Sequence, residues 1–172
     1  MTSASFIFRH LLAAAALLVV AAASGATQSS TAAAPTCRVT RIVDGDTVDC
    51  GGKRIRLLLI DAPERQQAPF GRRATATLAR LMPVGSSVRV EFDLDRTDRY
   101  GRLLAYLFTG QGTFVNEAIV RQGFAVPLVY PPNVRYVERI RAAASAARAE
   151  GVGLWAVNGF DCLPVDKRKR RC

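Results

Sequence analysis

Within residues 86–95, hydrophobic and polar positions alternate from Ser87 onward. The apolar set is Val88, Val90, Phe92 and Leu94, and the residues between them include Arg89, Glu91 and Asp93. This period of two predicts a strand with one buried face. A further strand is expected over the apolar segment 103–108, which follows a polar turn at residues 96–102.

The region before this strand predicts three more strands. Two short strands flank the Asp44-Gly45 pair, because Asp-Gly is a strong hairpin signal. Residues 53–60 predict a single strand that follows them. Its apolar end shows no alternation, which is expected of a strand that is covered on both faces.

Three segments have the period of a helix. Residues 71–82 place their apolar side chains on one side. Residues 115–122 are followed by Gly123, a favourable residue just past a helix end. Residues 134–150 follow Asn133, which is placed to cap that helix.

Five short strands with three helices indicate the α+β class with a mainly β core. A small five-stranded barrel of the OB-fold type, surrounded by three α-helices, fits this inventory. An open α+β sheet fits the hydrophobic pattern almost as well.

Residues 1–26 have the layout of a secretory signal peptide. Arg9 precedes the apolar segment 11–23, and the small residues Ser24 and Ala26 suit a cleavage site. The alternative is an uncleaved membrane anchor, but the apolar segment is shorter than the roughly 20 residues of a spanning helix. We therefore expect a secreted or periplasmic protein without a membrane span after cleavage. A flexible linker at 27–35, a domain at 36–160 and a basic tail at 161–172 would follow.

The formal net charge is +10, and nearly all of the positive charge comes from arginine. The planar guanidinium group suits phosphate better than a lysine does. A basic exported domain therefore points to nucleic acid or another polyanion. An arginine-rich surface that serves only solubility would give the same charge, as would a basic envelope protein that binds anionic glycans or lipid.

An even number of cysteines in an exported protein argues for disulfides. The four are Cys37, Cys50, Cys162 and Cys172, and three pairings are possible. Our hypothesis is Cys37–Cys50, because both lie at a similar distance from the first predicted turn. Cys162–Cys172 would then pin the basic tail. A zinc site is disfavoured because no C-x-x-C pair is present.

The only histidine, His10, lies inside the predicted signal peptide. A mature chain without histidine excludes histidine-based acid–base catalysis, histidine metal sites and Ser–His triads. If the protein is an enzyme, carboxylates must act as its general acid or general base.

Three charged clusters are candidates for chemistry. They are Asp44-Gly45-Asp46, Arg56 with Asp61 and Glu64, and the segment 96–102. Each cluster alone is more typical of a turn or an ion pair. Together they suit phosphodiester hydrolysis, in which carboxylates hold a hard cation, one carboxylate takes a proton from water and arginines hold the phosphate.

The motifs VDGDTV, RLLLIDAPE, RTDRYGRLLAY, VNEAIVRQGFA and VYPPN, followed by GLW, carry a family resemblance. In their order and spacing the chain resembles the staphylococcal nuclease family over about residues 39–155. The resemblance implies an OB barrel with three helices. It also implies a Ca²⁺-dependent endonuclease that cuts DNA and RNA and leaves 3′-phosphates. We expect a monomer that prefers single strands and has no stable protein partner.

The resemblance implies a role for each carboxylate. Asp46 and Asp61 would be the calcium carboxylates, and the backbone carbonyl of Ala62 would be a further ligand. Asp44 would support the site, and Glu64 would be the general base.

The resemblance also implies roles in binding the substrate. Arg56 and Arg102 would grip the scissile phosphate. Arg99 and Tyr100 would lie near the terminal phosphate of the bound nucleotide. Tyr130 would lie at the nucleotide pocket, where base stacking contributes about 1–3 kcal/mol.

Two alternatives stay open at this point. The first is a binding module, an OB domain that holds nucleic acid without cutting it; the presence of the complete catalytic set argues for cleavage. The second concerns the basic segment 167–171, which would either hold polyanions or form a disordered, solvated end.

Overall fold

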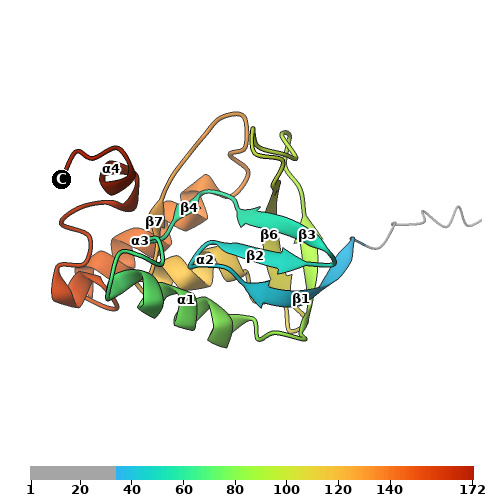
Figure 1. Ribbon diagram of the computed structural model, residues 1–172, viewed down its shortest axis with the longest axis horizontal. Coiled ribbons are helices and arrows are strands. Elements are labelled where there is room, and N and C mark those ends of the chain that lie inside the picture. Colours follow the sequence, from blue (N-terminus) through green and yellow to red (C-terminus); the bar gives the residue numbers. More distant parts are fainter. Residues whose placement is uncertain (1–33) are drawn as a thin grey trace, which may run out of the picture. The chain divides into compact units, whose positions relative to one another are not determined.

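The computed structural model describes residues 34–172 (Figure 1). The predicted signal peptide and nearly all of the predicted linker lie outside the described residues. Within residues 34–172, no helix is both long enough and apolar enough to cross a membrane.

Five strands close into a barrel in the order β1-β2-β3-β6-β5. They are β1 (Thr36–Ile42), β2 (Thr47–Cys50), β3 (Lys53–Leu57), β5 (Ser87–Glu91) and β6 (Leu103–Thr109). Neighbouring strands are antiparallel except for the parallel pair β3 and β6. The first part of β1 pairs with β5 and its second part pairs with β2, so one strand closes the barrel. This confirms the predicted five-stranded OB-fold barrel.

The described residues contain four α-helices and one 3₁₀ helix. They are α1 (Phe70–Leu81), α2 (Val115–Arg121), α3 (Val137–Ala149) and α4 (Pro164–Arg168), with a 3₁₀ helix, η1 (Trp155–Val157). Helices α1 and α2 contact strands of the barrel. Helix α2 contacts α1, α3 and β6, so it is the central helix. Three of the helices match the predicted set. Helix α4 is an additional short helix in the tail, near the C-terminus (Figure 1).

The prediction of one strand over residues 53–60 is wrong beyond Leu57. Strand β3 ends there, and Leu58 and Leu59 form a turn in which Leu59 has a φ of 66°. Strand β4 (Ile60–Asp61) follows outside the barrel and pairs with β7 (Val126–Pro127). The turn is hidden in the sequence because the residues on both sides of it are as buried as those in the strand.

Two further details differ from the sequence pattern. Leu94 does not share the buried face of β5, because the strand ends at Glu91 and Leu94 is 73% exposed. Helix α3 begins at Val137, and Asn133 is not its N-cap. The Asn133 side chain is buried and instead bonds to the backbone N–H and carbonyl of Asp95, at 2.8 and 2.9 Å.

Two disulfides are present, and they join the same pairs as expected from the cysteine positions. Cys37–Cys50 links β1 to the end of β2. Cys162–Cys172 closes the C-terminal segment.

Candidate active site

Most of the predicted site residues line one cleft of about 950 Å³ beside the barrel. The predicted residues in its wall are Asp44, Asp46, Arg56, Glu64, Arg99, Tyr100, Arg102 and Tyr130. Asp61 and Ala62 are buried and are bonded to residues of this wall. The structure thus brings together side chains that are up to 86 residues apart in the sequence (44 to 130).

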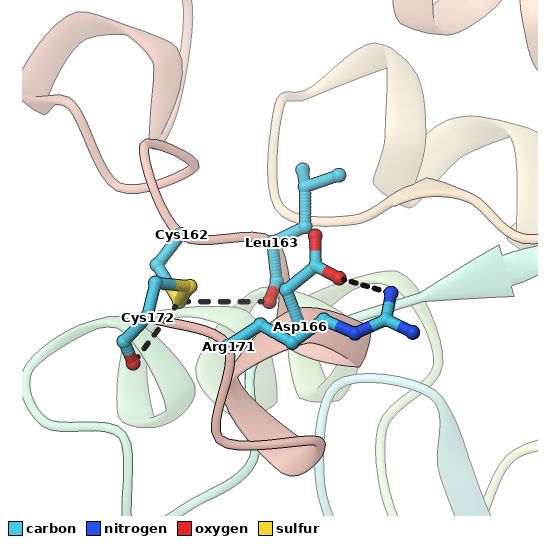
Figure 2. Close-up of a disulfide and its surroundings, with 5 residues drawn as sticks. All are labelled: Cys162, Leu163, Asp166, Arg171 and Cys172. Carbon is cyan, nitrogen blue, oxygen red and sulfur yellow. Dashed lines mark hydrogen bonds and ion pairs between the residues drawn. A yellow bond between two sulfur atoms is a disulfide. The ribbon is translucent and has the colours of Figure 1, made fainter.

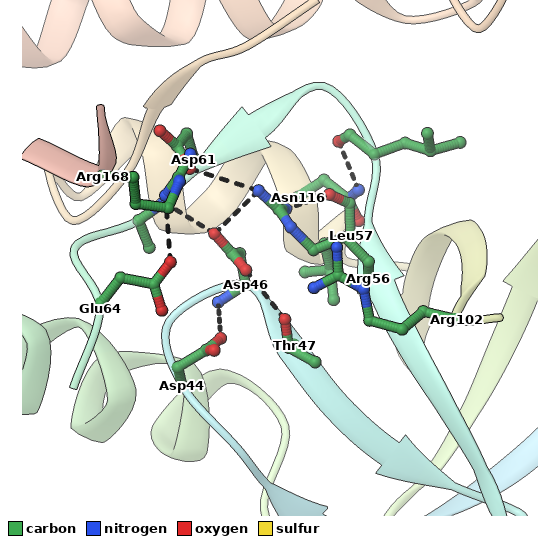
Figure 3. Close-up of polar contacts among 12 residues, drawn as sticks. Asp44, Asp46, Thr47, Arg56, Leu57, Asp61, Glu64, Arg102, Asn116 and Arg168 are labelled. Atoms are coloured by element: carbon green, nitrogen blue, oxygen red, sulfur yellow. Dashed lines mark hydrogen bonds and ion pairs between the residues drawn. The ribbon is translucent and has the colours of Figure 1, made fainter. Parts of the chain in front are cut away.

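Asp46 connects the first turn to the other carboxylates. One of its oxygens accepts a hydrogen bond from the backbone N–H of Ala62 at 2.8 Å, and the other accepts one from the Thr47 hydroxyl at 3.0 Å. Its own N–H donates to Asp44 at 3.0 Å. Because Asp46 is only 6% exposed, these bonds fix its side chain in one orientation (Figure 3).

Gly45 allows this turn to approach the chain around Ala62. A Cβ atom at position 45 would lie 2.6 Å from the Cβ of Ala62 and 2.7 Å from that of Ala74 in α1. The glycine is therefore required for close packing. It is not among the residues of positive φ.

Asp61 lies in β4 and its side chain is fully buried. Its Oδ1 atom lies 3.4 Å from Nη2 of Arg56 and 2.8 Å from Nη2 of Arg168. Its Oδ2 atom is also buried and has no hydrogen-bond partner among residues 34–172. A buried carboxylate oxygen without a partner is costly, so this atom is an available ligand.

Arg56, in β3, points into the carboxylates. Its Nη2 lies 3.0 Å from Asp46, and its Nη1 donates to the carbonyl of Leu57 at 2.7 Å. The side chain is 13% exposed. One guanidinium group therefore lies against two carboxylates, Asp46 and Asp61, and satisfies a backbone carbonyl at the end of β3.

Glu64 is positioned by the chain that leads into α1. Its backbone N–H donates to the side-chain oxygen of Gln67 at 2.7 Å. Its carboxylate is about one-third exposed and accepts a bond from Nη1 of Arg168 at 3.1 Å. Glu64 thus lies at the edge of the cleft, where water can reach it.

Asp98 holds Arg102 in place. It accepts a bond from Nε of Arg102 at 2.7 Å and from the backbone N–H groups of Tyr100 and Arg102. Burial alone would raise the pKa of Asp98, but these bonds hold the pKa below its usual value. In Figure 3 the Arg102 side chain extends toward Arg56. Its Nη atoms make no hydrogen bond to any described residue and are available to a ligand.

The outer part of the cleft carries two exposed aromatic side chains. Tyr100 is 68% exposed and Tyr130 is 65% exposed. Arg99 donates a 2.5 Å bond to the Tyr100 hydroxyl and also lies over its ring. Exposed aromatic rings beside arginines are typical of surfaces on which bases stack.

Two contributors to the site were missed in the sequence. Asn116 in α2 is fully buried and bonds to the carbonyls of Leu58 and Ala105 and to the N–H of Leu107. Its amide therefore satisfies the backbone where β3 ends. A polar residue on the buried side of an apolar helix was the available signal. No sequence pattern singled out Arg168, because it lies in the basic segment 167–171, which has no hydrophobic period.

The acidic side chains fit a hard cation. Burial and the carboxylate of Asp46 raise the pKa of Asp44 to about 6. Burial and Asp46 also raise the pKa of Asp61, although Arg168 and Arg56 act in the opposite direction. Such crowding is relieved by a bound cation with oxygen ligands. Among residues 34–172, no three acidic, histidine or cysteine side chains converge as they stand. The guanidinium groups of Arg56 and Arg168 lie among the carboxylates of the site.

The sequence was also compared with known proteins. The family model described as "Staphylococcal nuclease homologue" matches residues 54–157, more than half of the chain. Thermonuclease of Staphylococcus hyicus is 36% identical over 130 residues, which cover 70% of this chain and 76% of that protein. Endonuclease YncB of Bacillus subtilis (strain 168) is 35% identical over 131 residues, 70% of this chain and 61% of that protein.

A second protein of the same Bacillus strain also matches. The SPbeta prophage-derived endonuclease YokF is 36% identical over 131 residues, 70% of this chain but 44% of that protein. The chain therefore spans less than two thirds of the length of both Bacillus relatives and about three quarters of the Staphylococcus hyicus protein. The matched family model and the identity to these relatives show that the chain belongs to the staphylococcal nuclease family.

Proposed function

We propose that this protein is an exported, Ca²⁺-dependent endonuclease that hydrolyses phosphodiester bonds of DNA and RNA and leaves 3′-phosphates. The observation that carries the proposal is one cleft that is lined by Asp46, Arg56, Glu64 and Arg102, in which Arg56 also contacts the buried Asp61. The names of the relatives, endonuclease and thermonuclease, support the same activity.

In this proposal the phosphate is held by arginines. The free Nη atoms of Arg102 reach a non-bridging oxygen from one side, while Asp98 fixes its Nε. Arg56 contributes from the other side. Planar guanidinium groups hold phosphate oxygens with two parallel bonds, which also stabilises the additional negative charge of the transition state.

Glu64 accepts the proton. Water at the edge of the cleft gives a proton to the Glu64 carboxylate, and the hydroxide formed attacks phosphorus in line with the 5′-oxygen. The P–O5′ bond breaks and the leaving oxygen takes a proton from solvent. The products are a 3′-phosphate and a 5′-hydroxyl group.

Asp46, Asp61 and the carbonyl of Ala62 would hold calcium, with Asp44 in support. When bound, the ion supplies positive charge next to the phosphate and orients water. The raised pKa values of Asp44 and Asp61 and the unpaired Oδ2 of Asp61 support this assignment.

We further propose that Tyr100 and Tyr130 stack on bases of a single strand and that the protein acts as a monomer. Export is supported by the two disulfides, which persist in oxidising compartments. Mass spectrometry of the N-terminus of the purified native protein would test cleavage near Ala26.

The main test is cleavage of a fluorescent single-stranded DNA by the purified protein, with calcium and with EGTA. Glu64→Gln is compared with Glu138→Gln, a control that makes the same change at a side chain that is 79% exposed on α3. We expect cleavage that requires calcium and falls about 10²- to 10⁴-fold in Glu64→Gln only. Product ends that become extendable only after phosphatase treatment would identify 3′-phosphates.

Other results would change the proposal. Equal cleavage by Glu64→Gln and by the control would reject Glu64 as the base. A folded protein that binds the strand with calcium but never cuts it would be the non-cleaving OB module instead.

A further inference from the structure

Residues 162–172 form a closed loop rather than a free end. The disulfide Cys162–Cys172 joins the two ends of this C-terminal loop, and α4 lies between them (Figure 2). Inside the loop, the Arg171 guanidinium pairs with Asp166 at 3.3 Å, and the Arg171 N–H donates to the Asp166 carbonyl at 3.0 Å. A covalent bond and local polar contacts therefore limit how far the loop can move.

The chain that leads into the C-terminal loop is anchored beside β4 and β7. Phe160 is 6% exposed and packs with Leu154 and Val126 in a small second core. Val126 belongs to β7 and pairs with Asp61 in β4. The C-terminal loop therefore starts next to the strand that carries the most buried carboxylate of the site.

Arg168 reaches from this loop into the cleft and bridges two carboxylates. Its Nη2 lies 2.8 Å from Oδ1 of Asp61, and its Nη1 lies 3.1 Å from Oε1 of Glu64 (Figure 3). Val165 and Lys169 from the same loop also line the cleft. The C-terminal loop is thus part of the cleft wall.

These contacts match what the carboxylates need when they carry no other cation. Asp61 is fully buried, and a buried negative charge is costly without a positive partner. Arg56 lies 3.4 Å from the Asp61 oxygen, whereas Arg168 lies at 2.8 Å. Arg168 is therefore the nearer of the two partners of Asp61. The planar fork of its guanidinium group can also bond to two carboxylates at once.

We infer that Arg168 is an intramolecular counter-ion that competes with calcium for Asp61 and also holds Glu64 in an ion pair. The inference rests on the proposed function, which assigns Asp61 to the metal and Glu64 to the proton. The two cations neutralise the same buried carboxylate, that of Asp61, so the metal binds fully only when Arg168 withdraws. Glu64 accepts a proton from water only when it no longer pairs with Arg168. Arg168 is a positioning residue that sets the metal affinity of the site.

The size of the effect follows from the fraction of molecules in which Arg168 is withdrawn. The apparent affinity for calcium is the intrinsic affinity multiplied by the fraction of molecules in which Arg168 is withdrawn. If that fraction is on the order of a tenth to a third, removing the guanidinium group should tighten calcium binding about 3- to 10-fold.

The test measures calcium binding by titration calorimetry in the absence of nucleic acid. Arg168→Gln removes the charge, and Arg168→Lys keeps a charge that cannot form the fork. Arg170→Gln is the matched control, because Arg170 is exposed in the same loop and forms no ion pair with any residue of the described part. A Cys162→Ser/Cys172→Ser double variant opens the loop.

We expect Arg168→Gln to bind calcium about 3- to 10-fold more tightly, Arg168→Lys to lie between it and the parent, and Arg170→Gln to match the parent. The double serine variant should resemble Arg168→Gln, since an open loop no longer holds Arg168 in place. Unchanged or weaker binding by Arg168→Gln would overturn the inference. A double serine variant with parental affinity would overturn the role of the closed loop.

The same titration separates this inference from the proposed function. If neither the parent nor Arg168→Gln binds calcium at millimolar concentration, the calcium assignment fails, and the competition fails with it. If both bind equally, the calcium assignment stands and only the competition fails.

Discussion

Gly71 in the first turn of α1 packs directly against the backbone carbonyl of Glu64, and no side chain fits between them. The helix therefore supports the residue that we propose as the general base. Because Gly71 has no positive φ, its role is this close approach and not an unusual backbone conformation.

Gly71→Ala should consequently displace Glu64. Shifts on the order of 1 Å at a reacting group cost about 10²-fold in rate. We expect DNA cleavage at saturating calcium to fall by roughly that factor, with a lower melting temperature. Gly110→Ala is the control, because a Cβ at Gly110 meets no atom within 4 Å. Gly71→Ala with parental kcat would show that Glu64 tolerates this displacement.

Arg102→Lys tests the two-bond grip on phosphate. Lysine keeps the charge but loses both the planar fork and the Nε bond to Asp98. The kcat for single-stranded DNA should fall about 10²- to 10³-fold while calcium affinity is unchanged. Arg141→Lys makes the same change at an exposed position on α3 and should have parental kcat. Full activity in Arg102→Lys would mean that a point charge suffices.

Asn116→Ala tests the support beneath the site. The change leaves the Leu58 carbonyl and the Leu107 N–H without their side-chain partner in a buried region. Each unsatisfied buried group costs about 1–3 kcal/mol, so the free energy of unfolding in urea should fall by about 2–4 kcal/mol. Gln111→Ala, at an exposed loop position, should have little effect. A loss no larger than in that control would show that water replaces the amide.

Tyr100→Ala and Tyr130→Ala test base stacking. Each variant should weaken single-stranded DNA binding by about 1–3 kcal/mol, which anisotropy can measure in a Glu64→Gln background with calcium. Val84→Ala removes a similarly exposed apolar side chain, at 63% exposure, and should bind as the background does. Parental affinity in both tyrosine variants would exclude stacking at these positions.

The sequence predicted the barrel well because its strands obey local rules. Val88 and Val90 alternate with charged residues and are buried as the period requires. The family motifs also identified side chains that line the same cleft. The β3–β4 turn was missed because burial on both sides of Leu58 and Leu59 removes the polar signal that usually marks a turn.

Arg168 could not be predicted for a different reason. Its position depends on the packing of Phe160 and on the disulfide Cys162–Cys172, whose cysteines are 10 residues apart. Neither feature produces a hydrophobic period in the basic segment. Asn133 was misassigned because an asparagine before a helix is usually a cap. Here its amide bonds to the backbone of Asp95 instead.

The contacts that build the site span long stretches of chain. The Asn116 bond to Leu58 joins residues 58 apart, and the Arg168 bond to Asp61 joins residues 107 apart. Contacts of large sequence separation form late in folding, because the chain must first lose the entropy of closing a long loop. We therefore expect the barrel to fold first and the cleft last. In the export that we propose, the site would be complete only after the segment that carries Arg168 has left the translocation channel.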